Sequence, residues 1–338
     1  MSEVLRVDAE KLQAAVAAIM EKEGVAPQDA AIVADSLVSA ELTGLQSHGV
    51  QRVKFYTDSM EAGGTDPRCR IKTIRDFTGG ALLDAQGALG IVAAYRAMEL
   101  AIQKAKDVGI GIVNVRNSNH CSCTAYYIRM AAKENMLAIV SSNAPKSMAP
   151  WGSREKYLGT NPLAVGAPTH GDPVMIDMAT SVVARGKIMN ARQQGKPIPE
   201  GWALDAQGKP TTDPEAAMKG TMIPVGDAKG AALAMMVEIL TGCLNGANCG
   251  YEAAPFMADD HLPPDLGQTF MAIDPEKCSG SFLAKVGSLA GVISSQDGAR
   301  IPGERRFQQR RRNLREGIFI PDDLFRELVD LARQGRQI

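Results

Sequence analysis

Apolar side chains near the start of the chain recur at the spacing of amphipathic helices. Leu12, Val16, Ile19 and Met20 would share one face of a helix that Asp8 can cap. Pro27 opens a second helical pattern, and a third runs over residues 50–60 and stops at Gly63-Gly64. Residues 304–317 and 321–335 repeat the helical spacing at the other end. We therefore expect both ends of the chain to be helical.

The middle of the chain alternates between two patterns. Short β-branched runs predict strands at residues 81–84, 109–115, 136–141, 174–178 and 269–273, and longer apolar patterns predict helices at residues 90–106, 124–133 and 229–244. In the last helix, Met235 and Met236 are expected in the core. Residues 195–214 are expected to form an ordered loop or hairpin, and residues 251–267 a long irregular segment of the kind that often carries function. The alternation predicts an α/β or α+β fold with helices covering a sheet.

Composition narrows the class of protein. The 338 residues are 45% hydrophobic and 22% charged with a net charge of −1, so nothing favours binding to nucleic acid or to an anionic membrane. Six cysteines form no C-x-x-C pair, which argues against a zinc site and indicates a reducing, cytoplasmic location. We find no apolar signal core and no run long enough for a transmembrane helix. The arginine-rich stretch 305–315 is either a solvated helix face or a phosphate site.

Two of the four histidines lie in settings that suit catalysis. His48 and Arg52 would be one turn apart on the third helix, where a guanidinium fork and an imidazole could hold a substrate carboxylate. A surface pair at a helix start explains that spacing equally well. His120 follows a buried strand and precedes a helix, the position where α/β proteins place ligands. Its neighbours in Asn117-Ser118-Asn119 could fix the imidazole tautomer, although a capping role for this histidine is the alternative.

The remaining histidines and the glycines give weaker signals. His170 is expected to face solvent, and a metal site at Asp259-Asp260-His261 is much less probable than a solvated loop. The chain has no G-x-G-x-x-G after a strand, so a nucleotide would need a site unlike the Rossmann turn. Helix starts that could receive phosphate oxygens occur near four polar or glycine-containing motifs: Gly159-Thr160-Asn161-Pro162, Asp177-Met178-Ala179-Thr180-Ser181, Lys229-Gly230 and Pro302-Gly303-Glu304-Arg305.

These motifs and several others occur together in one order. They are Ser47-His48-Gly49-Val50 with Arg52, Ser118-Asn119-His120, Ala149-Pro150-Trp151-Gly152, Gly159–Pro162, Asp177–Ser181, Gly186-Lys187, Gly201-Trp202 with Asp205 and Gly208, Lys229-Gly230, and Pro302–Arg306. In this order, over residues 5–330, the chain resembles the malate/L-lactate dehydrogenase family, which is distinct from the Rossmann lactate and malate dehydrogenases. The resemblance implies a non-Rossmann NAD(P)-binding α/β domain at residues 68–303, a helical subdomain made of residues 1–67 with 304–338, and a homodimer with the active site near the subunit contact.

The resemblance also implies roles for single residues. His120 would be the general acid and base, with His48 and Arg52 on the substrate carboxylate. No metal is implied. The residues implied to line an NAD(P)H cofactor are Ser142, Asn143, Thr160, Asn161, Asp177, Met178, Ala179, Thr180, Lys187, Lys229, Gly303 and Arg305. Lys229 and Arg305 would pair with the negative charges of its phosphates.

Departures from the family pattern leave the substrate open. Cys121-Ser122 stands where an aromatic residue and a glycine are common, and Lys146 stands where a neutral residue is expected. Lys146 slightly favours an open-chain 2-oxo acid with a second acidic group over a cyclic 2-imino acid. A catalytically idle nucleotide- or metabolite-binding protein is the third alternative. Arg185, Lys187 and Arg192 could meet the 2′-phosphate of NADPH or simply form an exposed basic helix, so the choice between NADH and NADPH stays open.

Overall fold

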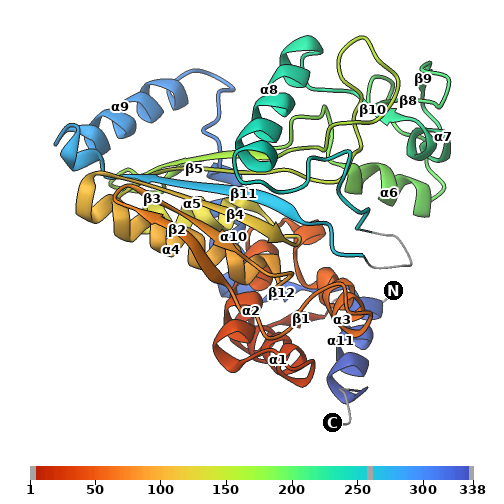
Figure 1. Cartoon of the computed structure of the whole chain (residues 1–338), viewed down its shortest axis with the longest axis horizontal. Coiled ribbons are helices and arrows are strands. Elements are labelled where there is room, and N and C mark those ends of the chain that lie inside the picture. The colour runs from red at the N-terminus through yellow and green to blue at the C-terminus, as the bar shows by residue number, and fades with distance from the viewer. Residues whose placement is uncertain (1–4, 257–261, 335–338) are drawn as a thin grey trace.

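A seven-stranded mixed sheet forms the centre of the computed structural model, which describes residues 5–256 and 262–334 (Figure 1). In spatial order the strands are β2 (Lys72–Phe77), β3 (Gly80–Asp84), β4 (Ile110–Ser118), β11 (Leu266–Ile273), β5 (Leu137–Ser142), β6 (Leu163–Ala167) and β7 (Val174–Met178). Only β3 and β4 pair in parallel, and the other neighbours are antiparallel. The sheet is therefore not the parallel sheet of a Rossmann fold.

Helices cover both faces of this sheet. On one side α4 (Gly90–Val108) packs on β4 and β11, and α5 (Thr124–Lys133) packs on β5 and β6. On the opposite side lies α8 (Ala228–Glu238), which continues into the π-helical turn η3 (Ile239–Cys243) against β11 (Figure 1). The α/β class expected from the alternating pattern is confirmed.

The two chain ends pack together at one end of the molecule (Figure 1). The elements are β1 (Arg6–Val7), α1 (Ala9–Lys22), α2 (Pro27–Leu42) and α3 (Val53–Glu61) from the start, and α10 (Glu304–Glu316), β12 (Ile318–Phe319) and α11 (Asp322–Gln334) from the end. β1 pairs with β12, α2 contacts α10, and α1 contacts α11. Their apolar faces share one continuous core with the sheet and with α4 and α5. The boundary between a helical subdomain and a central domain at residue 67 therefore stays a prediction.

A second, smaller apolar cluster lies around Met148, Ile188 and Ala234. It is enclosed by α6 (Arg185–Gln193), α7 (Pro214–Lys219) and a small sheet of β10 (Thr221–Met222), β8 (Ala203–Leu204) and β9 (Pro210–Thr211). The hairpin expected at residues 195–214 is present as β8 and β9.

Several features differ from the sequence prediction, among them the following. The helix expected from residue 50 begins as α-helix only at Val53, after the 3-10 turns η1 (Gln46–His48) and η2 (Val50–Arg52). Met235 and Met236 are not core residues, since 52% and 38% of their surfaces are exposed. The helix α9 (Phe282–Ser294) was not predicted, and it projects from the body with no buried residue (Figure 1). A helix with apolar side chains all round lacks the one-sided pattern that identifies an amphipathic helix.

Candidate active site

His120 lies two residues beyond the end of β4 and four before α5, as the sequence predicts. Its Nδ1 is 2.8 Å from the hydroxyl oxygen of Tyr56 on α3. The backbone N–H of Ser122 points at the same nitrogen from 3.4 Å. The ring is thus held through Nδ1, and Nε2 has no hydrogen-bond partner among residues 5–256 and 262–334.

The surroundings of His120 keep it neutral. Burial, then the charge of Arg52 and the neighbouring His48, lower the pKa of His120 well below its usual value. Burial raises the pKa of the Tyr56 hydroxyl, so this partner keeps its proton. A hydroxyl can donate to Nδ1 or accept from it, so the hydrogen bond between Tyr56 and His120 can persist when the ring gains or loses a proton.

His48 lies beside His120 on η1. The two rings stack with centroids 5.9 Å apart, and the Ser122 hydroxyl donates to the His48 carbonyl at 2.9 Å. Burial is the main cause that lowers the pKa of His48 to about 4, and Arg52 and Arg306 act in the same direction against Asp177. His48 is therefore neutral near pH 7 and offers a hydrogen bond to a ligand, not a positive charge.

Arg52 completes this group. Its Nε donates to the carbonyl of Ser47 at 2.8 Å, which fixes the side chain and leaves the terminal N–H groups to meet an anion. The expectation that His48 and Arg52 share one helical face is wrong, because they lie on the separate turns η1 and η2. The two turns still bring both residues to His120, since the charge of Arg52 acts on both histidines.

Two aromatic rings, of Phe55 and Phe256, pack against the ring of His120. Phe256 meets the ring of His120 edge-on with centroids 5.2 Å apart, and Phe55 does so at 6.0 Å. Phe256 comes from the irregular segment 251–267 that was expected to be functional. Neither aromatic residue nor Tyr56 was singled out from the sequence, because helical spacing cannot distinguish a site-facing ring from a core ring.

The polar run before His120 does not hold its imidazole, contrary to expectation. Asn117 donates to Asp84, Ser118 to Gln268, and Asn119 to the carbonyls of Gly87 and Ala88. These bonds anchor the end of β4. The atypical Ser122 performs the expected task through its backbone N–H and links the two histidines.

Two of the predicted cofactor residues, Asn143 and Asn161, are buried and fully bonded inside the protein. Both donate to the buried carboxylate of Glu238, at 3.3 and 2.9 Å. The backbone N–H groups of Gly159 and Gly250 complete this carboxylate's set of four donors. The amide oxygens accept from Ala144 and Gly267. The Asn143 and Asn161 side chains thus fix the backbone of their loops.

A second set of predicted cofactor residues is also bonded internally. Asp177 accepts from Thr124 at 2.7 Å and forms an ion pair with Arg306 at 3.0 Å. Thr180 donates to the carbonyl of Thr160 at 3.0 Å, and Ser142 donates to the carbonyl of its neighbour Asn143. The first two bonds tie the end of β7 to α5 and α10, and the Thr180 bond ties the loop after β7 to the loop before β6.

The other predicted cofactor residues offer accessible groups. Met178, Lys187, Lys229 and Arg305 are exposed, and Ala179 and Gly303 are partly exposed. Lys229 lies in the first turn of α8, whose N-terminus has no side-chain cap. A Cβ at Gly230 would lie 2.1 Å from the carbonyl oxygen of Val225, so this turn requires a glycine. An uncapped helix start beside an exposed cation fits a phosphate group of a nucleotide.

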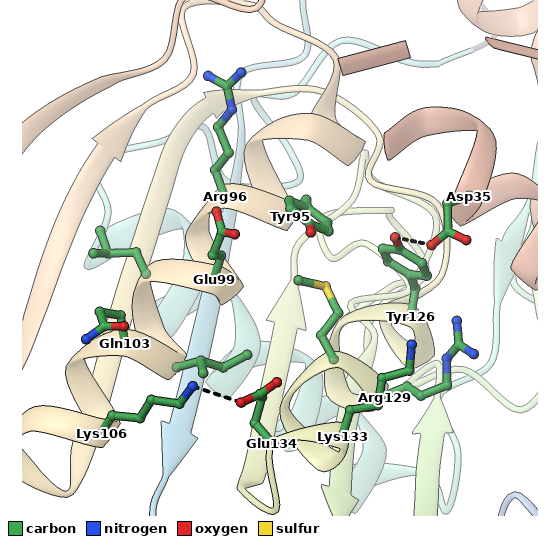
Figure 2. Close-up of a pocket in the computed structure, with 13 residues that line it drawn as sticks. Asp35, Tyr95, Arg96, Glu99, Gln103, Lys106, Tyr126, Arg129, Lys133 and Glu134 are labelled. Carbon is green, nitrogen blue, oxygen red and sulfur yellow. Dashed lines mark hydrogen bonds and ion pairs between the residues drawn. The ribbon is translucent and has the colours of Figure 1, made fainter. Parts of the chain in front are cut away.

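An open groove of about 650 Å³ lies elsewhere on the surface (Figure 2). It is lined by side chains of α2, α4 and α5, including Tyr95, Arg129 and Lys133. Several of its charges are matched within the groove, since Tyr126 donates to Asp35 and Lys106 pairs with Glu134 (Figure 2). Its lining contains none of the predicted site residues, and no function is assigned to it.

Two further sequence expectations concern metals and membranes. His170 is exposed, and Asp259-Asp260-His261 lies outside the described residues. Within residues 5–256 and 262–334, no group of three or more potential ligands could hold a metal ion. None of the helices in that part of the chain is long and apolar enough to cross a bilayer.

Two neutral histidines and a fixed arginine thus lie together between the start of the chain and the end of β4. The family model described as "Malate/L-lactate dehydrogenase" matches residues 7–329, and the chain belongs to this family.

Individual relatives agree with this. The chain is 40% identical to the (2R)-3-sulfolactate dehydrogenase (NADP(+)) of Chromohalobacter salexigens, covering 92% of this chain and 93% of that protein. It is 33% identical to the delta(1)-pyrroline-2-carboxylate/delta(1)-piperideine-2-carboxylate reductase of Pseudomonas putida, with 98% of both covered. The solved sulfolactate dehydrogenase of Methanocaldococcus jannaschii superimposes with a TM-score of 0.90 at 36% identity, covering 98% of this chain and 97% of that one.

The resemblance stated from the sequence is therefore confirmed, and the chain is an oxidoreductase. The alternative of a catalytically idle binding protein is not supported.

Proposed function

We propose that this protein transfers a hydride between NAD(P)H and C2 of a small open-chain 2-oxo acid, or in reverse from the 2-hydroxy acid. One observation carries the proposal: the partly buried His120 and His48 stack beside Arg52, with Nδ1 of His120 held by Tyr56. Relatives that act on sulfolactate support the same class of substrate.

Arg52 and His48 hold the substrate carboxylate. Because Nε of Arg52 is engaged by Ser47, its two terminal nitrogens face the ligand as a fork that matches a carboxylate. His48 is neutral and adds one hydrogen bond. This clamp fixes the orientation of C2 before reaction.

His120 exchanges the proton. In the oxidation direction Nε2 takes the proton from the substrate hydroxyl. For this step the ring carries its own proton on Nδ1 and donates it to Tyr56, and the long 3.4 Å contact from the Ser122 N–H is given up. In the reduction direction the protonated ring returns that proton to the oxygen at C2. The substrate carboxylate offsets the charge of Arg52, which favours protonation of His120 in the complex.

The cofactor is held by groups at helix starts. Lys229 at the start of α8 and Arg305 at the start of α10 meet its phosphates. A bound nicotinamide supplies or accepts the hydride. The bonded network of Asn143, Asn161 and Glu238 keeps the adjoining loops in a fixed shape.

A cluster of cations supports a substrate with a second acidic group. Lys146 and Arg185 both act on Lys156 and, after burial, lower its pKa. Burial and Arg192 also lower the pKa of Arg185. The neighbouring Gly186 lies next to Ser47, with 4.0 Å between the Ser47 Cβ and an ideal Cβ at Gly186, so the cluster approaches the carboxylate clamp. This favours malate-like or sulfolactate-like acids over lactate.

The alternative is reduction of a cyclic 2-imino acid, which the similarity to the Pseudomonas putida reductase supports. One panel separates the two. The absorbance of NADH and NADPH is followed with 2-oxo acids that carry or lack a second acidic group and with cyclic imines. We expect the highest kcat/KM with a doubly acidic 2-oxo acid. A higher kcat/KM with the imines would establish the alternative, and no oxidation of either nucleotide would refute both.

We further propose that the protein is a cytoplasmic homodimer. The helix α9 exposes Leu289 and Val292 by more than half, which supports burial against another chain. The six free thiols fit a reducing compartment. Light scattering on the eluting protein should give twice the mass of one chain, and a monomer mass would contradict the dimer.

A further inference from the structure

Two cysteine side chains face each other outside the proposed acid–base group. The sulfurs of Cys243 and Cys249 are 3.8 Å apart. Cys243 ends the π-helical turn η3 and is exposed, and Cys249 is partly exposed in the loop that follows. The other cysteines do not share this arrangement: Cys278, for example, is exposed and is far along the chain near α9.

The backbone on both sides of the pair is firmly anchored. Asn245 donates to the carbonyls of Val115 and Gln268 at 3.1 and 2.9 Å. Asn248 N–H donates to the carbonyl of Asp265 at 3.0 Å. The left-handed turn between the cysteines is made by Gly246, with φ of 66°. The two sulfurs are therefore brought together by a defined loop, and they need to approach by less than about 2 Å to form a covalent bond.

We propose that Cys243 and Cys249 form a redox-active dithiol that reacts with low-molecular-weight disulfides and closes to an intramolecular disulfide. Two cysteines with no redox function would not need their sulfur atoms to face each other in an accessible loop.

The chemistry runs in two exchanges. The Cys243 thiolate, the more exposed, attacks one sulfur of the external disulfide, forming a mixed disulfide and releasing one external thiol. Burial and the neighbouring Cys243 and Glu238 raise the pKa of Cys249 to about 12, so Cys249 reacts second. It loses its proton and attacks the Cys243 sulfur, and the second external thiol leaves with a proton. The two cysteines lose two electrons and two protons in total, and the external disulfide gains both.

The pair adjoins the network that shapes the cofactor loops. The carbonyl of Asn248 accepts from Asn143 at 2.6 Å, and Gly250 N–H donates to Glu238 at 3.1 Å. These residues flank Cys249 on both sides. Moving the Cys249 sulfur towards Cys243 displaces this backbone and with it Asn143. We therefore expect the disulfide to lower turnover several-fold, a consequence that rests on the proposed function.

The covalent step is tested on the full-length protein without any assay of activity. The reduced protein is incubated with oxidised glutathione, digested without reductant and analysed by mass spectrometry. We expect a cross-link between Cys243 and Cys249 that dithiothreitol removes. C243S and C249S should lack it, and the matched control C278S should retain it. Glutathione attached to Cys243 without the cross-link, or modification of Cys278 alone, would overturn the proposal.

The link to the active site is tested separately. Wild-type protein treated in the same way should lose turnover and regain it with dithiothreitol, whereas C243S should be unaffected by either reagent. Equal loss in C243S, or unchanged turnover of the fully cross-linked protein, would overturn the coupling. Absence of turnover before oxidation would instead count against the proposed function, because the cross-link is measured independently.

Discussion

At the scale of single residues, burial sets the protonation states of the proposed active site. His120 and His48 both have lowered pKa values, mainly because they leave water and lie near Arg52. Burial also raises the pKa of Tyr56, against the effect of Arg52, so Tyr56 keeps its proton. A neutral His120 is ready to accept a proton from a hydroxy acid, while reduction of the oxo acid requires the scarce protonated form.

This asymmetry predicts different pH profiles for the two directions. Above pH 6.5, kcat/KM for reduction should fall about tenfold per pH unit, because the free enzyme with protonated His120 becomes rarer. For oxidation, kcat/KM should stay level over the same range. Steady-state kinetics in both directions measure this. A level profile for reduction would show that His120 is not the proton donor.

Replacement of Arg52 is expected to weaken substrate binding. Arg52→Lys removes the fork that faces the carboxylate, and the lost charge-assisted hydrogen bonding should weaken substrate binding by roughly 1.5–3 kcal/mol. The KM should therefore rise about tenfold or more. The value of kcat should change much less. Initial rates over a range of substrate concentrations give both constants, and Arg129→Lys on the remote groove serves as control. A KM equal to that of wild type would exclude Arg52 from the clamp.

The buried carboxyl group of Glu41 should make the free energy of unfolding depend on pH. Burial raises its pKa to about 7, although the Val50 N–H donates to its carboxylate. The folded protein thus binds more protons than the unfolded chain between pH 4.5 and 7, so this contribution is complete below pH 4.5 and lost as pH rises through 7. Glu41→Gln, which does not titrate, should be more stable than wild type by up to roughly 3 kcal/mol at pH 8. At pH 5 this advantage should nearly vanish. Denaturant unfolding at both values measures it, and an equal difference at both would contradict the account.

At the scale of elements, loops at strand ends are held by buried polar bonds. The carboxylate of Glu238 at the end of α8 joins the loops after β5 and before β6. Its two oxygens receive two donors each, so the acceptor sites of this carboxylate are all used.

Replacing one oxygen of Glu238 by an amide nitrogen should destabilise the protein strongly. Glu238→Gln places an amide N–H₂ against two donors in either orientation, which leaves them unsatisfied and should cost roughly 2–4 kcal/mol. Cofactor affinity should fall as well, since the loops lose their anchor. Chemical denaturation and nucleotide fluorescence measure the two effects. Glu215→Gln, on the exposed face of α7, is the control and should change neither; a Glu238 variant as stable as this control would contradict the role of the network.

Elements with a clear period were predictable, and those without one were not. α4 and β4 lie where their patterns predict, each extending two or three residues past its predicted end. The strand β2 is exposed along its whole length, so it lacks the alternation of a half-buried strand. Contacts such as Tyr56 with His120 join residues 64 positions apart in the chain, and no local pattern encodes them. The two histidines of the proposed site were singled out because their loop positions and motif order are visible in the sequence.

At the scale of the whole molecule, the proposed site forms where the two main parts of the chain meet. His48, Arg52 and Tyr56 come from the helical start of the chain, and His120 comes from the central sheet. The shared core of these parts fixes their relative position. The proposed clamp and the proposed proton-transfer group are thus supplied by different parts of one continuous core.

The central claim is that His120 carries the proton in hydride transfer. It is tested most directly by the turnover of His120→Ala with the best 2-oxo acid of the panel, together with the fluorescence-monitored affinity for the reduced nucleotide. We predict that turnover falls by about 10² or more while the nucleotide dissociation constant stays within a factor of about two, since no predicted phosphate contact involves this ring. Turnover within a few-fold of wild type would contradict the account.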